Sequence, residues 1–73
     1  MNTITSEYTF TQTIVAICIN GQVVPCQFHP DFDTAQLSAT KLKEALNGLL
    51  SVVIIERVIS STLGYSDTIL ELV

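Results

Sequence analysis

The sequence has very little positive charge. Its 73 residues contain only three cations, Lys41, Lys43 and Arg57, against seven acidic residues, which gives a formal net charge of −4 at pH 7. A nucleic-acid-binding protein needs a cationic surface to displace counterions from phosphates, and an anionic membrane surface selects for the same feature. We therefore expect neither nucleic acid nor a membrane as a partner, and we expect any charged partner to be basic.

Charged residues of either sign are scarce, at 14%, whereas hydrophobic residues make up 48%. Disordered chains show the opposite balance, and the length fits one domain over residues 1–73. No apolar run approaches the ~20 residues that cross a bilayer. Residues 1–7 lack the basic and apolar segments of a signal peptide. These features predict a single cytoplasmic domain.

Glycine and proline are also few, and Asn20-Gly21 is the most specific local signal. A type I′ turn needs positive φ at both central residues, which Asn-Gly tolerates best. The turn predicts a hairpin in which Ile19 lies opposite Gln22 and Ile17 lies opposite Val24. Residues 3–13 alternate between threonine and apolar side chains, whereas residues 14–19 are apolar on both faces, so the first strand is expected to end in the core.

The chain has only two cysteines, Cys18 and Cys26, with no Cys-x-x-Cys spacing. The hairpin register places Cys18 opposite Val23 and Cys26 opposite Val15, on opposite faces of the two strands. A disulfide cannot bridge such positions. Two free thiols in a reducing compartment are expected.

A helix is predicted to begin near residue 33. Asp33 can act as the N-cap with Gln36 three residues later, and Phe32 and Leu37 stand at the positions of a hydrophobic staple. Ser38 is a rival cap that would start the helix later. One apolar stripe follows the helical period: Ala35, Ala39, Leu42, Leu46 and Leu49.

The helix is predicted to end at Asn47-Gly48, with Gly48 in the left-handed C′ position. The next segment, residues 49–59, is the most apolar part of the chain, and residues 52–55 are all β-branched, which favours a strand covered on both faces. The alternative is one continuous helix over residues 33–60. That helix would be apolar all round, and the remaining chain is too short to bury it.

The expected fold is α+β in the order ββαββ, with residues 68–73 as the last strand. Placing the most apolar strands centrally gives a four-stranded antiparallel sheet in the order 2-1-3-4, with one helix packed on one face. Pro25 then lies on an edge strand, where its missing N–H does no harm. This order resembles that of β-grasp folds. Their carrier proteins end in Gly-Gly, whereas this chain ends in Leu72-Val73, so a carrier role is not expected.

Four residues are candidates for an interaction site: His29, Asp31, Glu56 and Arg57. His29 and Asp31, with Asp33, form an H-x-D-x-D cluster whose side chains suit a divalent cation. A metal site needs a further ligand and supporting hydrogen bonds, and neither is visible, so a polar turn and a helix cap are favoured. Glu56 and Arg57 interrupt the apolar strand, one on each face. Arg57 is expected either to extend its charged end to the rim of the sheet or to pair locally, rather than to bind a carboxylate or phosphate.

No motif indicates a catalytic residue, a cofactor or a metal. One helix can cover only one face of the sheet, although the central strands are apolar on both, so apolar residues are expected to lie exposed on the other face. An exposed apolar face marks an interface, and two-fold symmetry is the commonest way to close one. The sequence therefore predicts a protein–protein interaction module, a homodimeric regulator or inhibitor without catalytic activity. The alternative is a small-molecule-binding or enzymatic subunit whose site forms between protomers from Arg57, His29 or Asp31.

Overall fold

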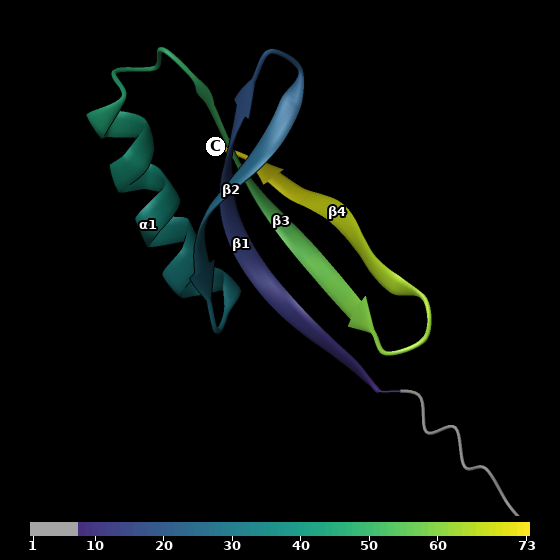
Figure 1. Cartoon of the computed structure of the whole chain (residues 1–73). Helices are drawn as coiled ribbons and strands as arrows, with labels where there is room; N and C mark the ends of the chain where they lie inside the picture. The colour runs from purple at the N-terminus through teal and green to yellow at the C-terminus, as the bar shows by residue number, and fades with distance from the viewer. Residues whose placement is uncertain (1–7) are drawn as a thin grey trace, which may run out of the picture.

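Residues 8–73 are described by the computed structural model (Figure 1). The elements follow the chain in the order β1 (Thr9–Ile19), β2 (Gln22–His29), α1 (Phe32–Ala45), β3 (Ser51–Ser60) and β4 (Gly64–Leu72). The four strands form one antiparallel sheet in the order β2-β1-β3-β4, with α1 on one side of it (Figure 1). The predicted ββαββ fold and strand order are confirmed. The part of the predicted alternation before Tyr8 lies outside the described residues.

The turn between β1 and β2 has the predicted conformation. Asn20 and Gly21 have φ values of 52° and 78°, as a type I′ turn requires. Ile19 pairs with Gln22 and Ile17 with Val24, so the predicted register is confirmed at this end of the hairpin.

Beyond Val24 the predicted register is wrong, because β2 contains a β-bulge. Pro25 lies opposite Ala16 and Gln27 lies opposite Val15, so Cys26 is an extra residue with no partner across the ladder. A bulge on this strand fits its position, because proline within a sheet is confined to edge strands and bulges. β4 has a matching bulge, because Ile54 pairs with Glu71 and Ile55 with Ile69. The two bulges lie at adjacent levels of the sheet, on either side of the Val15–Ile54 pair.

The helix begins earlier than predicted. Its N-cap is Asp31, whose Oδ1 accepts a hydrogen bond from the Thr34 backbone N–H at 2.8 Å, and neither Asp33 nor Ser38 caps it. The predicted staple is also wrong, because Leu37 is exposed whereas Phe32 packs into the core. Ser38 lies within the helix and hydrogen-bonds to the Gln27 side chain of β2.

The end of α1 is a Schellman motif. The backbone N–H of Asn47 donates to the Glu44 carbonyl at 3.1 Å, and that of Gly48 donates to the Lys43 carbonyl at 3.4 Å. With Leu46 as C-cap, Asn47 occupies the C′ position predicted for Gly48, and both residues have positive φ, at 52° and 72°. The continuous-helix alternative is wrong, because β3 starts at Ser51.

The core between α1 and the sheet follows the predicted stripe as far as Leu46. The fully buried residues of this core are Val15, Ala35, Ala39, Val52 and Ile54. Phe32, Leu42 and Leu46 pack against them. Leu49, the last predicted member of the stripe, is 82% exposed, because the Schellman motif turns the chain away from α1 before it.

A second buried cluster lies on the opposite face of the sheet, where no helix covers it. It consists of Ile14, Ala16, Val53 and Ile55, each at most 1% exposed, and Cys18 packs against it. Bulges increase the local twist of a strand and bend it. The two bulged edge strands flank this cluster, so we attribute its burial to the coiling of the sheet and to side chains from β2 and β4.

Candidate functional site

The face of the sheet opposite α1, called the bare face below, carries most of the large exposed apolar side chains of the sheet. Cross-strand pairing arranges these side chains in rows. Two apolar rows run across the whole sheet: Pro25, Ala16, Val53 and Leu72, and then Phe28, Ile14, Ile55 and Ile69. Further along come a polar row of Gln12, Arg57 and Asp67 and an aromatic row of Phe10, Ile59 and Tyr65.

Exposure on the bare face differs from the expectation. The central residues of the two apolar rows were expected to be exposed, but they are buried. The exposed apolar side chains come instead from the edge strands and from the start of β1. Phe28, Leu72, Ile69, Phe10 and Tyr65 are 56%, 74%, 53%, 56% and 64% exposed. The centre of the bare face is therefore a buried apolar cluster, called the floor below, which consists of Ile14, Ala16, Val53 and Ile55. Around it lie the exposed aliphatic and aromatic side chains named above, called the rim.

An ion pair interrupts this apolar surface. Arg57 on β3 holds Asp67 on β4 with two parallel hydrogen bonds, from Nε to Oδ1 at 2.8 Å and from the terminal guanidinium nitrogen to Oδ2 at 3.1 Å. The guanidinium also lies 4.3 Å from the centroid of the Tyr65 ring. The hydrogen bond that Arg57 donates to Asp67 raises the pKa of Arg57 above its usual value. The local pairing predicted for Arg57 is confirmed.

The sequence analysis missed Asp67 as the partner of Arg57. The signal was present, because a short turn after Ser60 fixes the register of the second hairpin. With Ser60 opposite Gly64, Arg57 must lie opposite Asp67. Counting back from the turn would have identified the pair.

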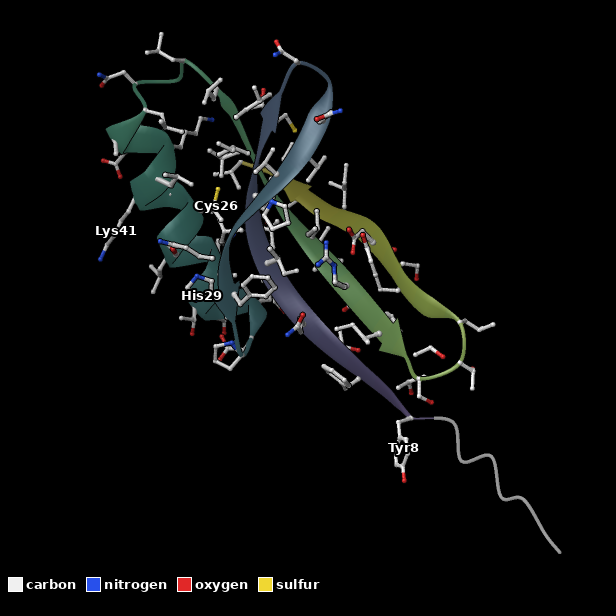
Figure 2. All side chains as sticks on the ribbon, viewed as in Figure 1. Tyr8, Cys26, His29 and Lys41 are labelled. Carbon is white, nitrogen blue, oxygen red and sulfur yellow. The ribbon has the colours of Figure 1, made fainter. Side chains whose placement is uncertain are left out.

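The four residues proposed from the sequence do not form one site. Arg57 lies on the bare face, whereas Glu56 points to the face that carries α1. His29 and Glu56 both lie opposite Thr13, from β2 and β3 respectively, so a whole strand separates them. His29 is half-buried, and its Nε2 is buried without a hydrogen-bond partner (Figure 2).

Asp31 has a structural role. The hydrogen bond from the Thr34 N–H at the start of α1 lowers the pKa of the Asp31 carboxyl below its usual value of 3.8. The H-x-D-x-D segment does not assemble as a metal site: across residues 8–73, no three histidine, cysteine or acidic side chains group so that they could hold an ion. Both cysteines are free, and Cys26 is exposed on the side of β2 near α1 (Figure 2).

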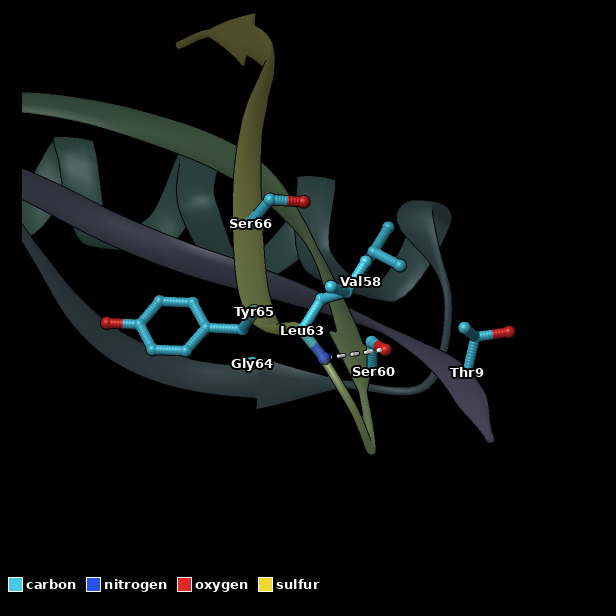
Figure 3. A pocket seen from close by; sticks show the side chains of 7 residues that line it. All are labelled: Thr9, Val58, Ser60, Leu63, Gly64, Tyr65 and Ser66. Carbon is cyan, nitrogen blue, oxygen red and sulfur yellow. Dashed lines mark hydrogen bonds between the residues drawn. The ribbon is translucent and has the colours of Figure 1, made fainter. Parts of the chain in front are cut away.

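A shallow hollow lies beside the β3–β4 turn. It has a volume of about 280 Å³ and is lined by Thr9, Val58, Ser60, Leu63, Gly64, Tyr65 and Ser66 (Figure 3). The Ser60 hydroxyl accepts hydrogen bonds from the backbone N–H groups of Thr62 and Leu63, each at 3.2 Å. The described residues of the lining offer the hydroxyl groups of Thr9, Ser60, Tyr65 and Ser66, and no carboxylate, imidazole or thiol.

Comparison of the chain with protein-family models, with curated proteins and with solved structures finds no match. Within the described part of the chain, no helix has the length and apolar character needed to cross a membrane.

Proposed function

We propose that this protein is a small cytoplasmic protein–protein interaction module without catalytic activity, which works as a homodimer closed over the bare face. The observation that carries the proposal is the apolar rim around the buried floor of that face. Five large side chains, Phe10, Phe28, Tyr65, Ile69 and Leu72, are each more than half exposed there. An apolar surface of this kind normally marks an interface. Two free thiols support a reducing compartment.

The distribution of charge favours a second copy as the occupant. Of the charged residues that the structure describes, only Arg57 and Asp67 lie on the bare face, and they neutralise each other. The other acidic residues among positions 8–73 lie on α1, on the loop before it or on the face that α1 covers. Two copies can therefore meet through their bare faces without bringing like charges into contact, although each chain carries a net charge of −4. A basic partner finds no free carboxylate on this surface.

A small-molecule site between protomers has less support. The guanidinium of Arg57 is already engaged by Asp67, and the carboxylate of Asp31 caps α1. His29 lies on the other face of the sheet from Arg57.

Sedimentation equilibrium at tens of micromolar tests the homodimer. We expect the wild-type chain to be dimeric and Ile69→Lys to be monomeric, because the substitution places a charge in an apolar row of the bare face. Leu37→Lys is the matched control, since Leu37 is 68% exposed on α1 and should tolerate the same change without altering the mass in solution. A wild-type chain that stays strictly monomeric would refute the homodimer.

A further inference from the structure

The polar row of the bare face lies inside the apolar surface rather than at its margin. On one side it adjoins the row that contains Phe28 and Ile69, and on the other the aromatic row that contains Phe10 and Tyr65. A partner that covers both apolar neighbours must therefore also cover the ion pair between them. This position gives Arg57 and Asp67 a role in choosing the partner.

We propose that Arg57 and Asp67 form a self-neutralising pair that a second copy of the chain buries on association, and that this pair restricts the bare face to a partner that brings no unpaired charge. The inference rests on the proposed homodimer and adds the residues that decide its specificity. Each protomer satisfies its own ion pair, so the interface needs no ion pair between the protomers.

The geometry of the pair suits burial. The two hydrogen bonds, at 2.8 and 3.1 Å, join a planar guanidinium to both carboxylate oxygens, the arrangement that best satisfies the two groups without water. The Tyr65 ring contacts the guanidinium, so only 18% of the Arg57 side chain and 33% of the Asp67 side chain remain exposed. A second copy therefore has little left to desolvate at the pair, provided that both members are present.

Removal of one member has a very different effect. The remaining charge would be buried in the interface without a counter-charge, which is the costly case for both folding and binding. Replacement of both members by apolar side chains removes that cost, because buried ion pairs are often exchanged for apolar groups without loss. If the pair acts by neutralising itself, each single variant should dimerise poorly and the double variant should dimerise like the wild type.

The experiment measures the dimer dissociation constant by sedimentation equilibrium for the full chain and four variants: Arg57→Met, Asp67→Leu, the double variant, and Lys41→Met. Lys41→Met is the matched control, because it removes one cation from the exposed surface of α1, away from the bare face (Figure 2). Circular dichroism of each variant, at concentrations where it is monomeric, shows whether it folds. In the monomer the pair is only partly shielded from water, so each single variant should still fold, with a Tm at most modestly below that of the wild type.

We expect each single variant to raise the dissociation constant by about 30-fold or more, the usual consequence of truncating one partner of a buried charge pair. The dissociation constant of the double variant should lie within about threefold of the wild-type value or below it. Lys41→Met should change the dissociation constant by about twofold or less. Folded single variants that dimerise like the wild type would overturn the inference, because the pair would then lie outside the interface. A double variant as weak as the single variants would also overturn it, because the pair would then bind groups of the partner. Failure of the wild type to dimerise would instead refute the proposed function, so the two failures are distinguishable.

Discussion

Substitution of Gly48 by alanine tests the end of α1. Gly48 has φ of 72°, and a Cβ built on it would meet no atom within 4 Å, so the effect is confined to the backbone conformation. An L-residue in the left-handed region costs about 1–2 kcal/mol. Alanine also restricts the unfolded chain, which offsets about 0.4–1 kcal/mol of that cost. The net expectation is a loss of about 1 kcal/mol in the free energy of unfolding, or a Tm lower by about 4–8 °C for a domain of this size.

Thermal and urea unfolding followed by far-UV circular dichroism measure this loss, at one fixed protein concentration because association also shifts Tm. Asn47→Gly is the control, since Asn47 already has φ of 52° and glycine adopts that conformation without strain. We expect the control to be close to neutral. If residues 33–60 formed one helix, Gly48→Ala would instead stabilise the protein by about 1 kcal/mol. A higher Tm for Gly48→Ala would therefore refute the Schellman motif at this position.

Three further predictions concern the cap, the core and the thiols. Because the folded pKa of Asp31 lies below 3.8, its charged form stabilises the fold above that pH, and the contribution is lost as the pH falls through the folded pKa. Asp31→Asn should therefore lose less stability than the wild type in urea titrations between neutral pH and pH ~3; equal losses would contradict the charged cap. Ile55→Ala and Ile54→Ala should each cost about 2–5 kcal/mol in the unfolding of the monomer although they lie on opposite faces, and a cost near zero for Ile55→Ala would show that the floor of the bare face is exposed. Under denaturing, non-reducing conditions both Cys18 and Cys26 should be alkylated in intact-mass measurements; a chain that resists alkylation contains a disulfide.

The order of the elements was predictable because each signal was local or compositional. Asn20-Gly21 determines the first hairpin through its backbone conformation, and Pro25 identifies the edge strand through its missing N–H. The β-branched run in β3 required burial on both faces, which only a central strand provides.

The errors lie where tertiary packing chooses between equivalent local signals. Asp31 and Asp33 are equally good caps from the sequence alone. A helix that begins at Phe32 places the Phe32 ring against the core. Packing of Phe32 therefore selects Asp31. The bulges were missed because an extra residue in a strand has no sequence period of its own, although Pro25 marked the place of one of them.

The candidate site was only partly predictable. The sequence correctly placed Glu56 and Arg57 on opposite faces of β3, because alternation along a strand follows from backbone geometry. Burial of Ile14 and Ile55 without a covering helix could not be foreseen, because it depends on how strongly the whole sheet coils.

The paired bulges also bear on how this chain avoids fibre formation. Nearly half of its residues are hydrophobic, and an open sheet edge is a template on which further strands can add without limit. In β2 the bulge at Cys26 and the missing N–H of Pro25 break that template, and in β4 the bulge at Leu70 shortens it. Growth by edge-to-edge addition is thus discouraged at both ends of the sheet. The bare face stays available for association, and two copies that cover each other's bare face form a closed dimer rather than a fibre.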